Sequence, residues 1–169
     1  MSLKSMMARG TVVLAAAGKM MQTLQVRLTA GELKDGAEHF EPYGLTSNPL
    51  PGAEVLTAFL GGDRSHAVVL VASDRRYRIK ELAPGEVAIY TDEGDKVHFK
   101  RGRIIDIETD TLNIKATNSV NFDTPLITQT GQIMSQGDQV AGGVSQITHL
   151  HDGVEIGDDQ SGPPIPEAE

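Results

Sequence analysis

A repeat of paired apolar residues in the second half of the chain places the strongest constraint on its fold. From residue 102 onward, each unit carries two large apolar side chains separated by one residue, and Thr, Asn, Ser and Gln fill the rest. In an extended chain residues i and i+2 face the same side, so each unit has one narrow apolar face. The units begin seven and then eight residues apart, with the pairs Ile105/Ile107, Leu112/Ile114 and Val120/Phe122, followed by Ile127 and Ile133. A unit of this length predicts one strand and one turn.

One such ladder cannot bury its own apolar face, and its open strand edges would invite aggregation. Three identical chains wound around one axis solve both problems, because each chain supplies one side of a triangular prism with the apolar residues inside. The repeat therefore predicts a trimeric, intertwined β-helix over residues 96–147. The alternative is one more sheet of a β-sandwich. A sandwich has two inner faces to fill, and only 4% of the residues are aromatic, with no Trp.

The first half of the chain predicts an all-β domain, because Gly and Pro separate its strand-length apolar segments and no helical period is sustained. These segments are a hairpin at residues 10–29, "EVLTAFLGG", "HAVVLVASD", "YRIKEL" and a hairpin at residues 85–102 with its turn at "DEGD". Residues 30–52 predict a long surface loop that turns one or two aromatic side chains inward. The pattern predicts a small β-barrel or sandwich over about residues 10–95, preceded by an N-terminal tail at residues 1–9.

Composition excludes several classes of function. The chain has no Cys, which excludes disulfides and thiolate metal sites, and its net charge of −8 argues against a nucleic-acid partner. Its longest apolar runs are of strand length and its N-terminus lacks the pattern of a secretory signal, so we expect synthesis and retention in a cytoplasm unless another system exports it. No G-x-S-x-G, phosphate-binding loop or H-E-x-x-H pattern occurs. We therefore expect no catalytic residues and no enzyme activity.

Two histidines one residue apart, His149 and His151, predict a metal site in the C-terminal tip of residues 148–169. In an extended segment both imidazoles face the same side, and neutral imidazole is a common ligand of transition metals. A threefold axis would gather six imidazoles into an octahedral shell. Zinc in proteins prefers four ligands, so six nitrogens favour iron(II), with one Fe2+ ion per trimer. A filled shell leaves no open position for substrate, which predicts a structural metal.

Two other interpretations of the histidines remain. They can be two exposed side chains in a loop. Alternatively, the spacing of Gly143, His149, His151, Glu155 and Gly162 matches the first motif of cupins, in which two His and a Glu bind a catalytic metal. A cupin needs a second motif with another His on later strands, and only "PPIPEAE" follows, while none of the other three histidines has a matching context. A cupin-type metalloenzyme that uses His149, His151 and Glu155 is the alternative function.

Several stretches together resemble a known family: "EHFEPYGLTSNPLPGAE", "DRRYR", "GEVAIYTDEGD", "KRGRIIDI" and "THLHDGVEIG". They are similar to the baseplate assembly protein V of Mu-like contractile-tailed phages, which is related to the spike proteins of type VI secretion systems. The resemblance runs from about residue 9 over nearly the whole chain. It implies an N-terminal OB-fold barrel, a trimeric β-helix and a C-terminal tip whose HxH histidines, here His149 and His151, bind iron.

The resemblance also implies the function. We expect a non-enzymatic spike at the centre of the tail baseplate that pierces the host outer membrane. Its expected partners are two further copies of itself, the phage tail hub and baseplate proteins, and the host outer membrane, without nucleic acid. Its expected location is the virion, with the host cytoplasm as the site of assembly.

Overall fold

The computed structural model describes residues 6–153 and residue 157. Over these residues the chain is all-β, with ten strands, two 3-10 turns and no α-helix. The all-β class expected from the sequence is therefore confirmed. The chain divides into two compact units, of which the first ends at Ile114 and the second begins at Lys115. Each unit is described by itself below.

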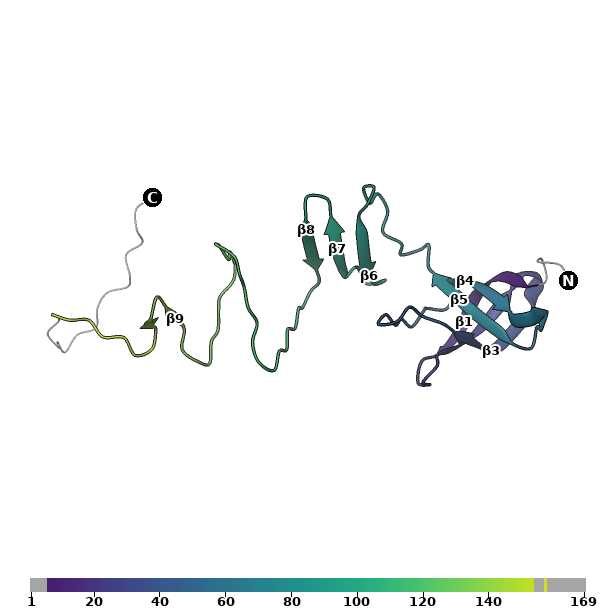
Figure 1. Ribbon diagram of the computed structural model, residues 1–169, viewed down its shortest axis with the longest axis horizontal. Helices are drawn as coiled ribbons and strands as arrows, with labels where there is room; N and C mark the ends of the chain where they lie inside the picture. Colours follow the sequence, from purple (N-terminus) through teal and green to yellow (C-terminus); the bar gives the residue numbers. More distant parts are fainter. Residues whose placement is uncertain (1–5, 154–156, 158–169) are drawn as a thin grey trace. The chain divides into compact units, whose positions relative to one another are not determined.

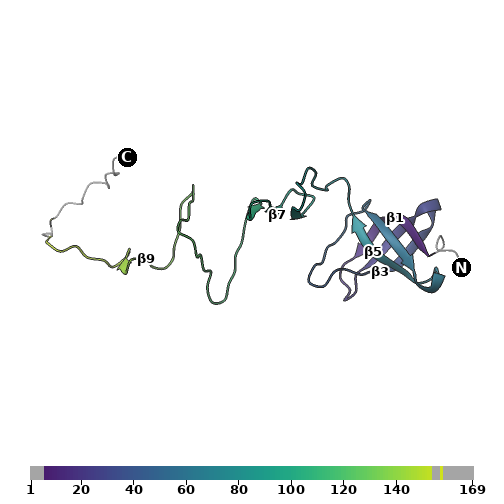
Figure 2. The same cartoon turned by 45° about the horizontal axis from the view of Figure 1, so that its top comes forward.

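Five strands of the first unit close into a barrel (Figures 1 and 2). They are β1 (Met7–Ala16), β2 (Thr23–Leu28), β3 (Leu33–His39), β4 (Glu54–Phe59) and β5 (Ala67–Ser73). The order around the barrel is β1-β2-β3-β5-β4, with the ring closed between β4 and β1. All neighbours are antiparallel except β3 and β5, which are parallel. A closed ring leaves no exposed strand edge along most of its circumference.

Alternating side chains along the strands fill the barrel. In β2 every second residue, from Leu24 to Leu28, is buried, and β4 has the same period. The buried apolar residues are Val12, Leu24, Val26, Leu28, Ala37, Ala53, Val55, Phe59, Ala67, Val68 and Val69. Phe59 is the largest of them, so small β-branched residues and Leu provide most of the core. Few aromatic residues therefore suffice for a barrel of this size.

The structure corrects the expected loop at residues 30–52. Residues 33–39 of this stretch form β3, whose buried side chains are the small Ala37 and the polar His39, so the apolar alternation was too weak to indicate a strand. The remaining loop also turns its aromatic residues outward: Phe40 is 52% exposed and Tyr43 is completely exposed. The expectation of inward aromatic side chains was wrong, because His39 occupies the inward position next to Phe40.

The expected strand "YRIKEL" is also absent. The backbone N–H groups of Tyr77 and Arg78 donate to the carbonyl of Asp74, which forms a turn directly after β5. The barrel is already closed at this point, so it offers no edge for another strand. Its strands end at Ser73, ahead of the boundary near residue 95 that the sequence suggested.

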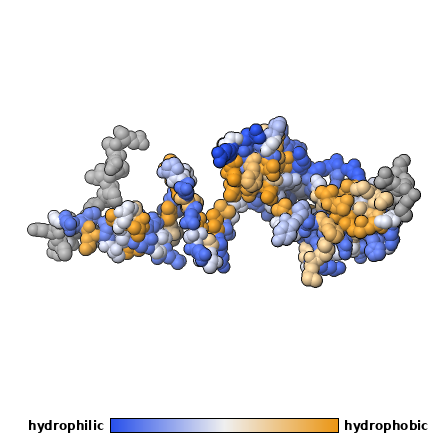
Figure 3. Space-filling model, in the orientation of Figure 1, coloured by the Kyte–Doolittle hydropathy of each residue, from blue (hydrophilic) through white to orange (hydrophobic). Residues whose placement is uncertain are grey.

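The expected hairpin at residues 85–102 is present but pairs outside the barrel. It forms β6 (Val87–Tyr90) and β7 (Lys96–Lys100), which join β8 (Ile104–Glu108) in a three-stranded antiparallel sheet. The cross-strand register places two rows of apolar residues on one face: Val87, Phe99 and Ile105, then Ile89, Val97 and Ile107. The other face carries the ion pairs Lys96–Glu108 and Lys100–Asp106. Figure 3 shows the apolar surface over this sheet.

The second unit contains one small hairpin, β9 (Val140–Ala141) with β10 (Val144–Ser145), joined by Gly142 and Gly143 at φ values of 58° and 86°. These positive values favour glycine in a two-residue hairpin turn. Residues 115–139 form no strand within one chain. The apolar side chains of this segment are 48–94% exposed, and they are Val120, Phe122, Leu126, Ile127, Ile133 and Met134.

Candidate functional site

The two histidines singled out from the sequence lie together after the β9–β10 hairpin. The ring centroids of His149 and His151 are 5.0 Å apart, with the rings inclined at 80° to each other. Both side chains are exposed, while Leu150 between them is also solvent-facing. The chain therefore presents two imidazoles from one short segment, close enough together to bind the same metal ion.

One of these imidazoles is oriented by the backbone. The Nδ1 atom of His149 lies 2.6 Å from the carbonyl oxygen of Ser145. A carbonyl can only accept, so this contact requires a proton on Nδ1 and leaves the lone pair on Nε2. Histidines that bind metals commonly donate their second N–H to a carbonyl or carboxylate in this way. His149 thus has the tautomer that a metal ligand needs.

The turn that carries His149 is tied by further hydrogen bonds. Ser145 Oγ accepts from the backbone N–H of Thr148 at 2.8 Å, and Asp138 accepts from the N–H of Ile147 at 3.1 Å. The side chain of Ser145, together with the N–H of Ile147, holds the pKa of Asp138 below its ordinary value although desolvation opposes this. Asp138 therefore stays ionised at neutral pH as an acceptor that fixes the approach to the histidines.

A single chain supplies only part of a metal site here. Among the residues that the structure describes, no group of three His, Asp or Glu side chains could hold an ion. Gly143 of the cupin-type spacing lies in the β9–β10 turn, whereas Glu155 and Gly162 lie outside the described residues. Two neutral imidazoles can contribute two nitrogens, and the remaining ligands would have to come from other chains or from water.

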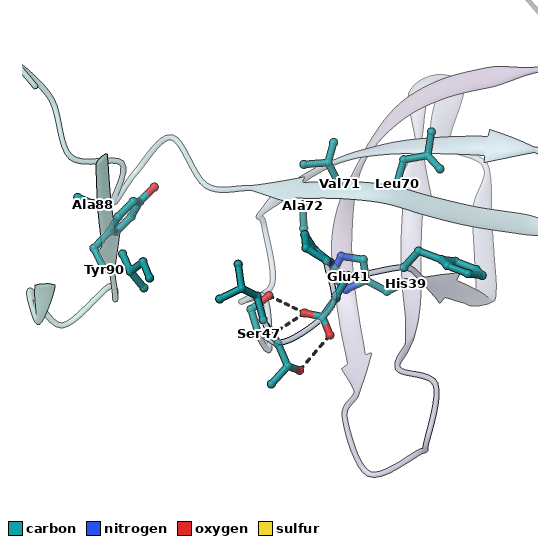
Figure 4. A pocket seen from close by; sticks show the side chains of 13 residues that line it. His39, Glu41, Ser47, Leu70, Val71, Ala72, Ala88 and Tyr90 are labelled. Carbon is teal, nitrogen blue, oxygen red and sulfur yellow. Dashed lines mark hydrogen bonds between the residues drawn. The ribbon is translucent and has the colours of Figure 1, made fainter. Parts of the chain in front are cut away.

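A pocket of about 390 Å³ lies in the first unit, beside the loop that follows β3 (Figure 4). Its walls are formed by the last residue of β3, by that loop, by β5 and by β6: His39, Phe40, Glu41, Pro42, Leu45, Thr46, Ser47, Leu70, Val71, Ala72, Ala88, Ile89 and Tyr90. Most of these side chains are apolar. Among its polar groups, Glu41 accepts hydrogen bonds from Thr46 and Ser47, and His39 is paired with Gln22 outside the pocket.

A hydrogen-bond network fixes the loop beside this pocket. The buried imidazole of His39 lies 2.9 Å from Gln22 Oε1, and Gln22 Nε2 donates to the carbonyl of Ser47 at 2.9 Å. Glu41 accepts from the N–H of Ser47 at 2.6 Å and from the hydroxyl of Thr46 at 2.9 Å. Desolvation raises the pKa of Glu41, but these donors outweigh it and keep the pKa below the ordinary value.

The network does not form a catalytic arrangement. The hydroxyl of Ser47 donates to Glu41, while Nδ1 of His39 is paired with Gln22, so Ser47 and His39 are not a nucleophile and its base. Sequence reasoning did not find this network, because it joins residues 17 and 25 positions apart that carry no recognisable motif. A Gln and a His beside a Pro-rich loop are its only sequence signal. The network is structural and fixes the loop shape.

The described part of the chain contains no helix that is long and apolar enough to cross a membrane.

Comparison with known proteins points to one family. The family model described as "Bacteriophage Mu Gp45, N-terminal" matches residues 9–76, which include the barrel strands apart from the first two residues of β1. The baseplate puncturing device gp45 of Escherichia phage Mu is 40% identical to this chain over 143 residues, covering 84% of the chain and 72% of that relative. The Mu-like prophage FluMu protein gp45 of Haemophilus influenzae is 32% identical, covering 97% of the chain and 92% of that relative.

Proposed function

The chain belongs to the Mu Gp45 family, and we propose from this premise that it is the structural spike at the centre of a contractile phage tail baseplate. The observation that carries the proposal is the 40% identity to a baseplate puncturing device over 84% of the chain. The family resemblance seen in the sequence is thereby confirmed. The protein belongs to the tail baseplate of the virion, after assembly in the host cytoplasm. The barrier that it punctures is the host outer membrane.

We propose a mechanical division of labour without an enzyme activity. The barrel attaches the spike to the tail hub and other baseplate proteins, the repeat transmits the axial force, and the tip meets the outer membrane first. A narrow point concentrates the load on few lipids. Support comes from the phage Mu relative, which is a baseplate puncturing device, and from the hydrogen bonds that engage His39 and Ser47 beside the barrel pocket. Nucleic acid is no partner in this account, since the net charge is −8.

The working form of the spike is a homotrimer with an intertwined β-helix. Support comes from the apolar face of the β6-β7-β8 sheet, which six side chains make almost uniformly hydrophobic while the other face is charged. It also comes from the exposed apolar side chains of residues 115–139, which pair with no strand of their own chain. Two further copies would cover these groups and complete the backbone hydrogen bonds. Each interchain hydrogen bond contributes only about 0.5–1.5 kcal/mol net, but the axial force is shared by all of them.

The tip would hold one iron(II) ion per trimer, bound by His149 and His151 of each chain. The donor set fits this group, because the contact between His149 Nδ1 and the Ser145 carbonyl leaves Nε2 available. Six neutral imidazole nitrogens suit iron(II) better than zinc. When bound, the ion would supply a crosslink between three chain ends, without an open coordination position.

A comparison of two variants of the full-length protein tests the tip against the cupin alternative. The double substitution His149→Ala with His151→Ala should abolish iron, measured by elemental analysis, and leave the trimer intact. Glu155→Gln should keep the iron in the spike and lose it in a cupin. Particles that carry the double-His variant should adsorb normally but permeabilise the outer membrane less often. Iron retained by the double-His variant, or lost from Glu155→Gln alone, would overturn the proposed tip.

A further inference from the structure

A second candidate binding site lies on the barrel wall, in a depression of about 380 Å³. Its lining contains three arginines, Arg9, Arg27 and Arg75, and one carboxylate, Glu54. The hydroxyl-bearing residues Thr11 and Thr29 also line it, with Gly10 and Leu28 between them. We name this feature the arginine depression. Its charged lining carries three positive charges and one negative charge.

The strand register explains why these residues gather. Thr11 of β1 is paired with Arg27 of β2 on one side and with Glu54 of β4 on the other, so the three side chains share the outer face of the barrel. Arg9 lies two residues before Thr11 on the same face. Arg75 reaches the site from the turn that follows β5. Four segments distant in the sequence thus build one surface.

Glu54 orients two of the three guanidinium groups. Arg75 forms a fork on both carboxylate oxygens, with Nη2 2.7 Å from Oε2, and Nη2 of Arg9 donates to the same Oε2 at 3.1 Å. The side chains of Arg9 and Arg75 nevertheless remain 71% and 73% exposed. Each guanidinium has five donors, so most of the N–H groups of this pair are still free for a ligand. Arg27 is exposed in the same lining.

We propose that the arginine depression binds carboxylate groups on the docking face of an acidic protein partner. The planar guanidinium fork matches a carboxylate in two parallel hydrogen bonds, and the hydroxyl groups of the two threonines can donate to the same group. The positive charge is local, because residues 6–76 contain seven basic and seven acidic side chains in total. A small positively charged site on a barrel of zero net charge can neutralise one or two carboxylates. A nucleic-acid strand requires a longer basic track.

The barrel of one chain supplies all the residues of this site, so neither a second copy nor the metal is needed to build it. It gives the barrel a means of electrostatic attachment, whose strength and rate of formation fall as salt rises. Arg27 is the best position for a test, because its replacement leaves the contacts of Glu54 with Arg9 and Arg75 in place.

The test uses the full-length protein and a fluorescent peptide of ten glutamates as the probe, with binding measured by anisotropy at low and high salt. Arg27→Glu should weaken binding about tenfold or more, and the wild-type affinity should fall with salt. Lys19→Glu is the matched control, because it makes the same charge change in the β1–β2 turn outside the depression. It should change the affinity by less than about twofold. Circular dichroism and light scattering establish that both variants fold and keep the same molar mass.

Three outcomes would overturn the proposal. The first is equal peptide binding by Arg27→Glu and wild type, or an equal loss in Lys19→Glu. The second is tighter, Arg27-dependent binding of a single-stranded oligonucleotide, which would assign the depression to phosphates. The third is a drop in molar mass in folded Arg27→Glu, which would assign it to contacts between copies of this chain.

Discussion

Gly10 is the residue on which the close approach of β1 and β2 depends. It pairs with Leu28 of β2 and with Val55 of β4, and a Cβ atom at this position would lie 2.6 Å from the carbonyl oxygen of Arg27. The carbonyl carbon of Arg27 and the Cδ2 atom of Leu28 would each lie 3.1 Å from that Cβ atom, and a backbone carbonyl has little freedom to adjust. The absence of a side chain is therefore a requirement of the close contact between β1 and β2, while the alternation along β1 places Arg9 and Thr11 on the outer face.

Replacement of Gly10 tests this requirement. Gly10→Ala should destabilise the barrel by about 1–3 kcal/mol, because either the strands must separate or the new methyl group is compressed. Gly18→Ala is the control, since it lies in the β1–β2 turn with no atom within 4 Å of the added Cβ. Hydrogen exchange of the β1 and β2 amides measures the local stability. Equal protection in Gly10→Ala and wild type would show that the strands can adjust at no cost.

Single residues also show what the sequence could and could not predict about the tip. The spacing of His149 and His151 was sufficient to expect two neighbouring imidazoles, because residues i and i+2 of an extended chain share a side. The hydrogen bond that selects the tautomer of His149 depends on the carbonyl of Ser145. That backbone contact follows from the shape of a turn, which the residue types alone do not determine.

Among the elements, the β6-β7-β8 sheet is the clearest case of an unpartnered face. Phe99 lies in the middle of its apolar face, between Val87 and Ile105. Phe99→Ser should prevent or weaken trimer formation, because three copies of this change would place polar groups and cavities in the proposed interface. Asp106→Asn on the opposite face is the control and should remain trimeric. Light scattering separates the two results, and a fully trimeric Phe99→Ser protein would exclude this face from the interface.

Glu86, the residue directly before β6, predicts sensitivity to acid. The backbone N–H groups of Arg101 and Ala83, followed by the imidazole of His98, hold the pKa of Glu86 below its ordinary value of 4.5. A carboxylate whose pKa is lower in the folded than in the unfolded state stabilises the fold at pH values above its unfolded pKa. This contribution is lost as the pH falls through the folded pKa. Glu86→Gln should therefore be less stable than wild type at pH 7, and the difference should shrink below about pH 4.5.

Thermal unfolding followed from pH 7 to pH 3 measures this difference. Glu108→Gln is the control, since its side chain is largely exposed and pairs with Lys96 at the sheet surface. A stability difference between Glu86→Gln and wild type that stays constant from pH 7 to pH 3 would show that ionisation of Glu86 does not stabilise the fold.

The element predictions succeeded where apolar alternation was strong and failed where other forces decided. The hairpin of β6 and β7 followed from its alternation and its "DEGD" turn, which the structure confirms. β3 was missed because its inward positions are Ala37 and His39, which do not form an apolar stripe. The strand expected at "YRIKEL" is a false positive, because closure of the barrel left it no partner. Closure depends on all five barrel strands together, so the residues of one segment do not predict it.

At the scale of the whole molecule, a barrel with its own core contrasts with a repeat that has none. The matched family region, residues 9–76, covers the barrel, and the barrel buries its apolar side chains within one chain. Residues 115–139 bury none of theirs within one chain. The repeat pattern predicted this deficit, since two apolar residues per unit cannot form a core alone. The number of copies that cover it is a matter of symmetry, which a measurement of molar mass determines.

We propose that three chains share one spike and one metal ion. Light scattering across a wide dilution range, combined with elemental analysis of the same wild-type sample, measures both properties. We expect a molar mass of three chains at every concentration and one iron per three chains. A folded monomer of 18.1 kDa that carries one metal per chain would contradict it.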